Sequence, residues 1–100
     1  MGFTAVKAMA IAKLLAGDYA HEGRGDIDDK NLLATGVVSA KDVADVLKRS
    51  RGQDHTSSAH HQDASVEVHV IACSGWYVKF YFDPELMFIS VHTAGQGSES

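Results

Sequence analysis

The fold is decided by residues 65–93, which read SVEVHVIACSGWYVKFYFDPELMFISVHT. Apolar and polar side chains alternate in three runs of this stretch, and a period of two is typical of β-strands with one buried face. The apolar members of the runs are Val66, Val68 and Val70; Trp76, Val78, Phe80 and Phe82; and Met87, Ile89 and Val91. The pattern predicts a three-stranded antiparallel sheet with one apolar face and one polar face.

The register of the predicted strands follows from the rule that residues opposite each other in an antiparallel pair share a face. To bring the apolar rows together, the first loop needs an odd number of residues, and the shortest is Cys73-Ser74-Gly75. The second loop is even-numbered and centred on Pro84-Glu85, where proline fits a turn. The predicted apolar pairs are Val70–Val78, Val68–Phe80, Val78–Val91, Phe80–Ile89 and Phe82–Met87. The predicted polar-face pairs are His69–Lys79, Lys79–Ser90, Tyr77–His92, Glu67–Tyr81 and Tyr81–Phe88.

Two or three helices are expected before the sheet. Residues 3–16 are rich in alanine and end at Gly17, which suits the position after a helix. Residues 29–35 favour one or two helical turns. Ser39 begins the clearest helix, because Ser39 is a good N-cap and Asp42 completes a capping box. The predicted fold class is therefore α+β, with two to three N-terminal helices packed on a three-stranded or four-stranded antiparallel sheet.

The composition is that of one globular domain over residues 1–100, with 45% apolar and 22% charged residues. The domain is expected to carry an acidic loop at 18–30, a polar loop at 52–63 and a flexible tail at 94–100. The single cysteine excludes an internal disulfide and fits the reducing cytoplasm. No apolar run approaches the roughly 18 residues of a membrane span, so we expect a cytoplasmic protein with no membrane partner.

The polar face of the sheet gathers side chains that donate protons, accept protons and bind anions. These side chains are Tyr77, Lys79, Tyr81, His69 and His92. The net charge of −4 argues against broad nucleic-acid binding, but residues 48–51, Lys-Arg-Ser-Arg, form a local basic patch that is expected at the rim of this face. Aromatic side chains beside cations suit single-stranded RNA, whose bases stack and whose phosphates need neutralising. The simpler interpretation is a solvent-facing surface without chemistry.

Two further groups of residues are weaker candidates. His55, His60, His61 and Asp63 are metal-ligating types, but their spacing matches no strong ligand motif and no cysteine lies among them. Cys73 in a tight turn is a candidate nucleophile, although a packing role is commoner for cysteine. We therefore expect no cofactor, and a small metal-dependent enzyme that uses His55 to His69 stays as a lesser alternative.

Three short pieces of sequence, within about residues 38–93, resemble a known family. They are Lys48 in Val-Leu-Lys-Arg-Ser, Gln62 in His-His-Gln-Asp ahead of Val-His-Val, and Tyr77 in Tyr-Val-Lys-Phe. Helices followed by an antiparallel sheet with a basic, tyrosine-containing face resemble the RelE-type ribonuclease toxins. The closer match is to the MqsR branch of toxin–antitoxin systems, which shows a helical lysine, then Gln-Asp before a strand, then Tyr-x-Lys in the next strand.

The resemblance implies a RelE-like fold and a metal-independent endoribonuclease of the mRNA-interferase type, in which the RNA 2′-hydroxyl attacks the adjacent phosphate. Lys48, Gln62 and Tyr77 carry over from the family pattern, and the geometry of the polar face adds Lys79 and His92. Lys48 and Lys79 would stabilise charge on the phosphate, and Gln62 would orient it. Tyr77 or His92 would move protons. The expected RNA-binding residues are Arg49, Arg51, His69 and Tyr81.

The partners implied are an RNA substrate and a protein antitoxin, and a homodimer stays open. A different class of function also stays open, because such toxins are usually basic whereas this chain is acidic. The alternative is a non-catalytic protein-binding inhibitor or regulator on the same small α+β fold, with an apolar patch around Trp76, Tyr81 and Phe88.

Overall fold

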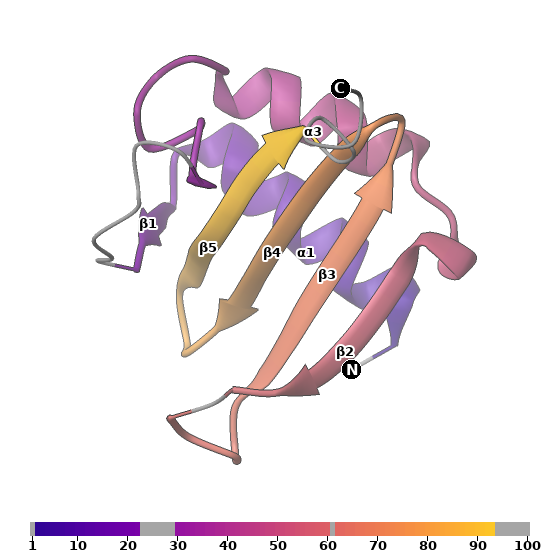
Figure 1. Cartoon of the computed structure of the whole chain (residues 1–100), viewed down its shortest axis with the longest axis vertical. Helices are drawn as coiled ribbons and strands as arrows, with labels where there is room; N and C mark the ends of the chain where they lie inside the picture. The colour runs from indigo at the N-terminus through magenta and orange to yellow at the C-terminus, as the bar shows by residue number, and fades with distance from the viewer. Residues whose placement is uncertain (1, 23–29, 61, 94–100) are drawn as a thin grey trace, which may run out of the picture.

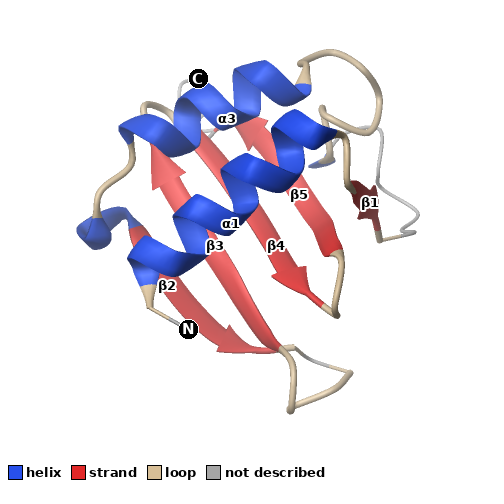
Figure 2. Cartoon of the chain, turned by 180° about the vertical axis from the view of Figure 1, so that it is seen from behind, coloured by secondary structure: helices blue, strands red, loops and turns tan. Residues whose placement is uncertain are grey.

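The chain folds into two layers, a twisted sheet and a pair of helices that both lie behind it in the view of Figure 1. The computed structural model describes residues 2–22, 30–60 and 62–93 of the 100-residue chain. The elements are, in chain order, α1 (Phe3–Ala16), β1 (Tyr19–His21), α3 (Ala40–Arg49), the short 3-10 helix η1 (Gly52–Asp54), β2 (His55–Ala59), β3 (Glu67–Cys73), β4 (Trp76–Phe82) and β5 (Leu86–Thr93). Figure 2, seen from behind, shows α1 and α3 crossing the same face of the sheet. No helix within the described ranges is long and apolar enough to cross a bilayer.

The sheet has five strands in the order β1-β5-β4-β3-β2, with β1 parallel to β5 and all other neighbours antiparallel. The α+β prediction and its three central strands are confirmed, but the sheet is larger than predicted and is mixed. β1 and β2 lie in segments where the sequence predicts loops. Both are edge strands with few apolar residues, Tyr-Ala-His and His-Thr-Ser-Ser-Ala, so neither shows the alternation that marks a half-buried strand.

The helical turns expected at 29–35 are present as one turn, in which the Thr35 N–H donates to the Asn31 carbonyl at 3.2 Å and Gly36 follows with a φ of 82°. Asn31 forms a parallel bridge with Val91, and residues 32–36 form turns. Residue 29, most of the predicted acidic loop at 18–30, and the whole predicted tail at 94–100 lie outside the described residues. The contact of Asn31 with β5 extends the sheet edge that β1 begins.

Local sequence signals fix the start of α3 and the end of α1. At the start of α3, the Ser39 hydroxyl accepts the Asp42 N–H at 3.1 Å, and the Asp42 carboxylate accepts the Ser39 N–H at 2.9 Å, which confirms the capping box. At the end of α1, Gly17 has a φ of 74° and its N–H donates to the Leu14 carbonyl. Glycine adopts this left-handed conformation without strain, so it closes the helix.

The main core lies between the helices and one face of the sheet. Its buried members are Val6, Ala10 and Leu14 of α1; Leu33; Val43, Ala44, Val46 and Leu47 of α3; and Ile71, Val78, Phe80, Leu86, Phe88 and Val91 of the sheet. Burial of each larger apolar side chain stabilises the fold by about 1.5–3 kcal/mol. The helices thus cover one face of the sheet and leave the opposite face uncovered by any helix of the described chain.

The β3–β4 hairpin turns at Ser74-Gly75, whose φ angles are 55° and 80°. Two consecutive positive φ angles are typical of the type I′ turn that suits the twist of paired strands. The predicted three-residue loop is therefore wrong, because Cys73 still pairs with Trp76. The other observed pairs are Ala72–Tyr77, Ile71–Val78, Val70–Lys79, His69–Phe80 and Val68–Tyr81.

This shift by one residue exchanges the two faces of β3, because side chains alternate along a strand. Val68 and Val70 turn away from the helices, whereas His69 and Ile71 face them. The predicted pairs Val70–Val78, Val68–Phe80, His69–Lys79 and Glu67–Tyr81 are wrong for this reason. Both faces of β3 carry apolar residues, Val68 and Val70 on one and Ile71 and Cys73 on the other, so the two-residue turn can bury the face that also holds His69.

The β4–β5 hairpin keeps the predicted pairing at one end and has a β-bulge in the middle. Three predicted pairs are present, Val78–Val91, Lys79–Ser90 and Tyr77–His92. The bulge lies between Lys79 and Phe80 and gives β5 one extra residue, so the remaining pairs are Phe80–Phe88, Tyr81–Met87 and Phe82–Leu86. It makes three predictions wrong, Phe80–Ile89, Phe82–Met87 and Tyr81–Phe88. Phe88 consequently enters the main core, and Ile89 packs on the other face with Val68 and Tyr81.

Two histidines, His55 and His69, pack together on the helix side of the sheet. His69 is 1% exposed, and its Nδ1 lies 3.0 Å from Nε2 of His55, with the two rings stacked at 5.2 Å. One nitrogen donates and the other accepts, so at least one ring is neutral. Burial lowers the pKa of His69; the nearby Glu67 carboxylate opposes this shift and the His55 ring adds to it. Burial also lowers the pKa of His21.

The fold is expected to lose stability as the pH falls below about 6.5, the ordinary pKa of histidine. In that range the unfolded chain takes up protons that His69 and His21 resist in the folded state, so the free energy of unfolding decreases toward their lowered pKa values. Urea unfolding at about pH 7.5 and about pH 5.5 measures the difference. His69→Gln keeps an amide beside His55 without a titrating ring, and it should reduce that difference. An undiminished difference in His69→Gln would contradict this account of His69.

Candidate functional site

The face of the sheet turned away from both helices is the candidate site, and we call it the open face (Figure 1). Strand pairing sets three rows of side chains across it: Ala72–Tyr77–His92, Thr56–Val70–Lys79–Ser90 and Ser58–Val68–Tyr81–Met87. The prediction that Tyr77, Lys79 and Tyr81 share one face holds. The rows divide this face into an end around Tyr77 and an end around Tyr81, which differ in structure.

At one end of the open face, Tyr77 and His92 form a stacked pair. Their ring centroids are 4.9 Å apart and the rings are nearly parallel, at 16°. Lys79 follows two residues later on β4 and pairs with Ser90, so its side chain belongs to the adjacent row of the same face. All three side chains are partly exposed. A phenol and an imidazole in contact, with a lysine in the adjacent row, therefore share one partly exposed region of the open face.

The hydrogen bond of His92 indicates which ring nitrogen carries the proton. Nδ1 lies 3.2 Å from the backbone carbonyl of Thr93, and a carbonyl only accepts, so Nδ1–H is the donor. In the neutral ring the lone pair is then on Nε2. A neutral imidazole with an available Nε2 lone pair is the form that acts as a general base.

At the other end of the open face, Glu22, His60 and Tyr81 form a compact polar triad. One carboxylate oxygen of Glu22 accepts both the Tyr81 hydroxyl and His60 Nε2, each at 3.0 Å. His60 Nδ1 accepts the Gln62 backbone N–H at 3.0 Å, which leaves Nε2–H as the donor to Glu22. The His60 and Tyr81 rings also meet edge to face at 5.0 Å. The triad joins the end of β1, the loop after β2 and the middle of the sheet.

Tyr81 is engaged in this triad rather than displayed for a ligand. The residue is 8% exposed and packs against Val68 and Ile89. Burial raises the pKa of Tyr81 to about 12, and the hydrogen bond to Glu22 and the negative charges of Glu22 and Asp83 add to the shift. Sequence analysis predicts Tyr81 as an RNA-binding residue, but its hydroxyl already donates a hydrogen bond to the Glu22 carboxylate.

Sequence reasoning missed Glu22 and His60 as partners because they are 38 residues apart. Glu22 reaches Tyr81 only through the parallel pairing of β1 with β5, which carries no periodic signal of its own. The sequence places Glu22 in the acidic segment at 18–30, directly after Tyr-Ala-His, and nothing there distinguishes it from the other acidic residues of that segment.

His69 does not lie on the open face, so that prediction is wrong. The β3–β4 register turns His69 toward the helices, where its ring lies 5.7 Å from that of Phe80 and 6.1 Å from that of Phe82. At 1% exposure, it offers no surface to an RNA chain.

The predicted basic residues belong to the helix layer. Lys48 and Arg49 lie in the last turn of α3, which covers the face of the sheet opposite the open face, and Arg51 follows this helix. All three are exposed. Arg49 reaches the β3–β4 turn, where its Nε donates to the Ser74 hydroxyl at 3.1 Å. Lys48 and Tyr77 are thus not brought together on one face.

Gln62 is exposed in the loop between β2 and β3, beside His60. Gln62 therefore lies at the Tyr81 end of the open face. Tyr81 and Tyr77 are four residues apart on β4, or about 13 Å at the rise of a strand. Of the five predicted catalytic residues, the fold gathers three, Tyr77, Lys79 and His92.

The histidine-rich segment does not assemble as the metal hypothesis requires. His55 faces the helices with His69, whereas His60 contacts Tyr81 on the open face. His61 lies outside the described residues. Among the residues that the structure describes, no group of three or more His, Cys, Asp or Glu side chains could hold a metal ion. Cys73, the candidate nucleophile, pairs with Trp76 at the strand end and packs against the main core.

Comparison with protein-family models, with curated proteins and with solved structures finds no match for this chain. Its function is therefore inferred from the arrangement of its own side chains.

The two tyrosines of the open face are expected to differ in their effect on stability. Tyr81→Phe removes a buried hydrogen bond to a carboxylate and should lower the free energy of unfolding by about 1.5–3 kcal/mol. Tyr77→Phe is the matched control, because its partly exposed ring keeps the stack on His92, and it should change stability by less than about 0.5 kcal/mol. Urea unfolding of the two variants tests this. Equal losses would contradict the structural role of the triad.

Proposed function

We propose that this chain is a metal-independent endoribonuclease that cleaves RNA on its open face by attack of the 2′-hydroxyl on the adjacent phosphate. The observation that carries the proposal is the stacked pair of Tyr77 and His92 with Lys79 in the adjacent row. These three groups supply the general base, the general acid and the cation that such a cleavage needs.

In this mechanism Nε2 of His92 takes the proton from the 2′-hydroxyl as the 2′-oxygen bonds to phosphorus. The bond from phosphorus to the 5′-oxygen of the next nucleotide breaks, and the Tyr77 hydroxyl gives its proton to that leaving oxygen. The ammonium group of Lys79 offsets the negative charge on the non-bridging oxygens. The products are a 2′,3′-cyclic phosphate and a 5′-hydroxyl, and an oriented general acid or base contributes about 10²–10⁴-fold to such a step.

The local charge of the open face supports RNA binding although the net charge of the chain is −4. The side chains that strand pairing sets around the proposed site are neutral or basic: Thr56, Val70, Ala72, Tyr77, Lys79, Ser90 and His92. A local positive charge such as that of Lys79, with no carboxylate among these neighbours, attracts phosphate even on an acidic protein. The flat ring of Tyr77 adds a surface for base stacking.

The layer arrangement supports the resemblance to RelE-type and MqsR-type toxins, because both helices lie on one face and the chemistry-bearing face of the sheet stays open. In that interpretation the protein acts in the cytoplasm and a protein antitoxin covers the open face. Tyr77 keeps the role that the family pattern implies. Lys48 and Gln62 have no part in the mechanism proposed here, because Lys48 lies in the helix layer and Gln62 lies in the loop at the Tyr81 end of the open face.

The alternative of a protein-binding regulator loses the surface on which it was based. Phe88 lies in the main core, Trp76 packs against the same core, and Tyr81 lies on the opposite face in the triad. The three side chains do not form one apolar patch.

The purified chain is expected to cleave single-stranded RNA in the presence of a metal chelator and to leave 2′,3′-cyclic phosphate ends. His92→Gln should lower the rate by about 10²–10⁴-fold, because it removes the proton acceptor. Lys79→Met should also lower the rate, whereas Lys41→Met, the same change on the exposed surface of α3, should not. Product ends and single-turnover rates are the measurements.

Circular dichroism of each variant provides the control for folding. Cleavage of DNA at the same rate as RNA would contradict attack by the 2′-hydroxyl. Full activity in His92→Gln would remove the proposed site.

A further inference from the structure

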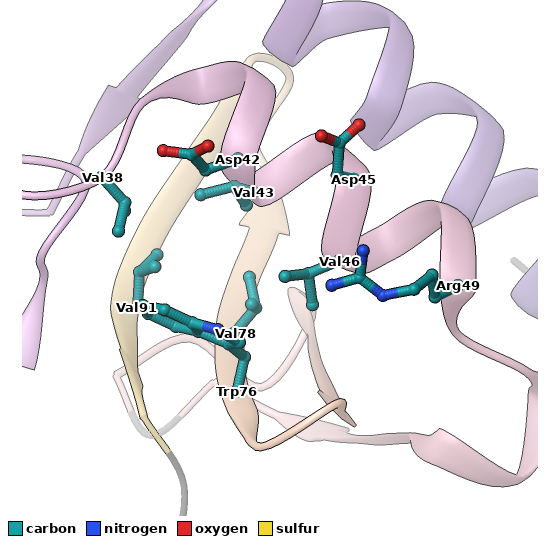
Figure 3. Close-up of a pocket in the computed structure, with 9 residues that line it drawn as sticks. All are labelled: Val38, Asp42, Val43, Asp45, Val46, Arg49, Trp76, Val78 and Val91. Carbon is teal, nitrogen blue, oxygen red and sulfur yellow. The ribbon is translucent and has the colours of Figure 1, made fainter.

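A groove lies on the helix side of the sheet, at the end where β4 begins and β5 finishes (Figure 3). Its volume is about 350 Å³, within the range of small-molecule sites. The apolar floor is made by Val43 and Val46 of α3 and by Trp76, Val78 and Val91 of the sheet. Three charged residues of α3 line the groove, with Asp42 and Arg49 at its two ends and Asp45 between them. The Asp45 carboxylate is paired with the Lys41 ammonium group at 3.2 Å, which offsets its charge.

Trp76 gives the groove an aromatic surface near the proposed cleavage site. It is partly exposed, and its neighbour Tyr77 points to the open face because side chains alternate along β4. Trp76 pairs with Thr93, the last residue of β5, so among the described residues the end of the sheet separates the side chains of Trp76 and Tyr77. An extended RNA chain that lies on Tyr77 and His92 reaches Trp76 by passing around this end of the sheet.

Arg49 puts a cation on that route. Its Nε donates to Ser74 at 3.1 Å, which holds the guanidinium beside the β3–β4 turn. Figure 3 shows the guanidinium extending over the mouth of the groove toward Val46. The Nε bond uses one of five N–H donors, and the remaining fork matches the geometry of a phosphate.

We propose that this groove binds one nucleotide of the RNA, with its base on Trp76 and the valine floor and its phosphate on Arg49. The inference rests on the proposed function in one respect, since the RNA cut at Tyr77 and His92 supplies the nucleotide. The groove lies outside that cleavage site, and it selects and holds the substrate.

The far end of the groove favours guanine. Asp42 and Arg49 are seven residues apart on α3, or about 10 Å along its axis, which is comparable with the span from a phosphate to the far edge of its base. A carboxylate only accepts, so Asp42 pairs with a base edge that presents two adjacent N–H donors, as guanine does and uracil does not. Asp42 keeps its charge, because the backbone hydrogen bond from Ser39 lowers its pKa.

Trp76 is the single tryptophan of the chain, so its fluorescence reports on the groove directly. We would titrate the cleavage-deficient His92→Gln variant with GMP, with UMP and with an uncleavable 2′-O-methyl oligonucleotide that contains guanine. Saturable quenching is expected with GMP and the oligonucleotide, at about tenfold lower concentration than with UMP, the ratio that one charged hydrogen bond supplies. Asp42→Asn should bring the GMP and UMP affinities together.

Arg49→Gln should weaken binding of GMP and of the oligonucleotide by about tenfold. Lys13→Gln removes the same charge from the end of α1, outside the groove lining, and should leave both affinities within about twofold. Thermal melts show that each variant is folded.

Absence of saturable quenching in a folded protein, or equal weakening by Arg49→Gln and Lys13→Gln, would overturn the proposal. Quenching by GMP but not by the oligonucleotide would also overturn it and assign the groove to free nucleotides. These outcomes are separate from the cleavage assay. A chain that binds RNA at Trp76 without cutting it contradicts only the proposed ribonuclease activity.

Discussion

The arrangement of both sheet faces depends on the two-residue turn at Ser74-Gly75. Because both residues have positive φ, the turn closes directly between Cys73 and Trp76 and fixes the register of β3 against β4. One more residue in this loop would exchange the faces of β3 and bring His69 out beside Lys79. Arg49 holds the same turn from the helix layer through the Ser74 hydroxyl, so the turn also links the two layers.

The bulge in β5 and the parallel strand β1 then divide the open face into two parts. The bulge lets Phe88 enter the main core while Ser90 and His92 stay on the open face. β1 brings Glu22 beside Tyr81, where the bonded triad lies among apolar side chains and stabilises that end. Tyr77, Lys79 and His92 stay partly exposed at the other end. One end therefore contributes mainly stability, and the other carries the groups suited to chemistry.

The sequence predicts the parts of this fold that have strong local signals. The capping box at Ser39, the helix end at Gly17 and the pair of Tyr77 with His92 are all present. It does not predict β1 or β2, because β1 has only three residues, Tyr-Ala-His, and β2 has mainly small polar ones, so neither shows apolar–polar alternation. It misplaces His69, because β3 carries apolar residues on both faces and the two-residue turn at Ser74-Gly75 buries the face of Ile71 and His69.

For the candidate site, the side chains of the β4–β5 hairpin are predictable near its open end, and those joined across the fold are not. Tyr77, Lys79 and His92 depend only on one hairpin, whose register is right at that end. Lys48 and Gln62 depend on how a helix and a loop pack around the sheet, which residue spacing does not encode. The triad of Glu22, His60 and Tyr81 depends on the parallel pairing of β1 with β5. Residue spacing does not encode that pairing either, so the triad is not predictable from the sequence.

The central claim is that RNA lies on the open face at Tyr77, Lys79 and His92. The most direct measurement is a titration of ¹⁵N-labelled protein with uncleavable 2′-O-methyl RNA, followed by NMR chemical shifts of the backbone amides. The largest changes are predicted at Tyr77, Lys79 and His92, with small changes along α1. Changes confined to α1 and the outer surface of α3, with these three amides unaffected at saturation, would contradict the claim.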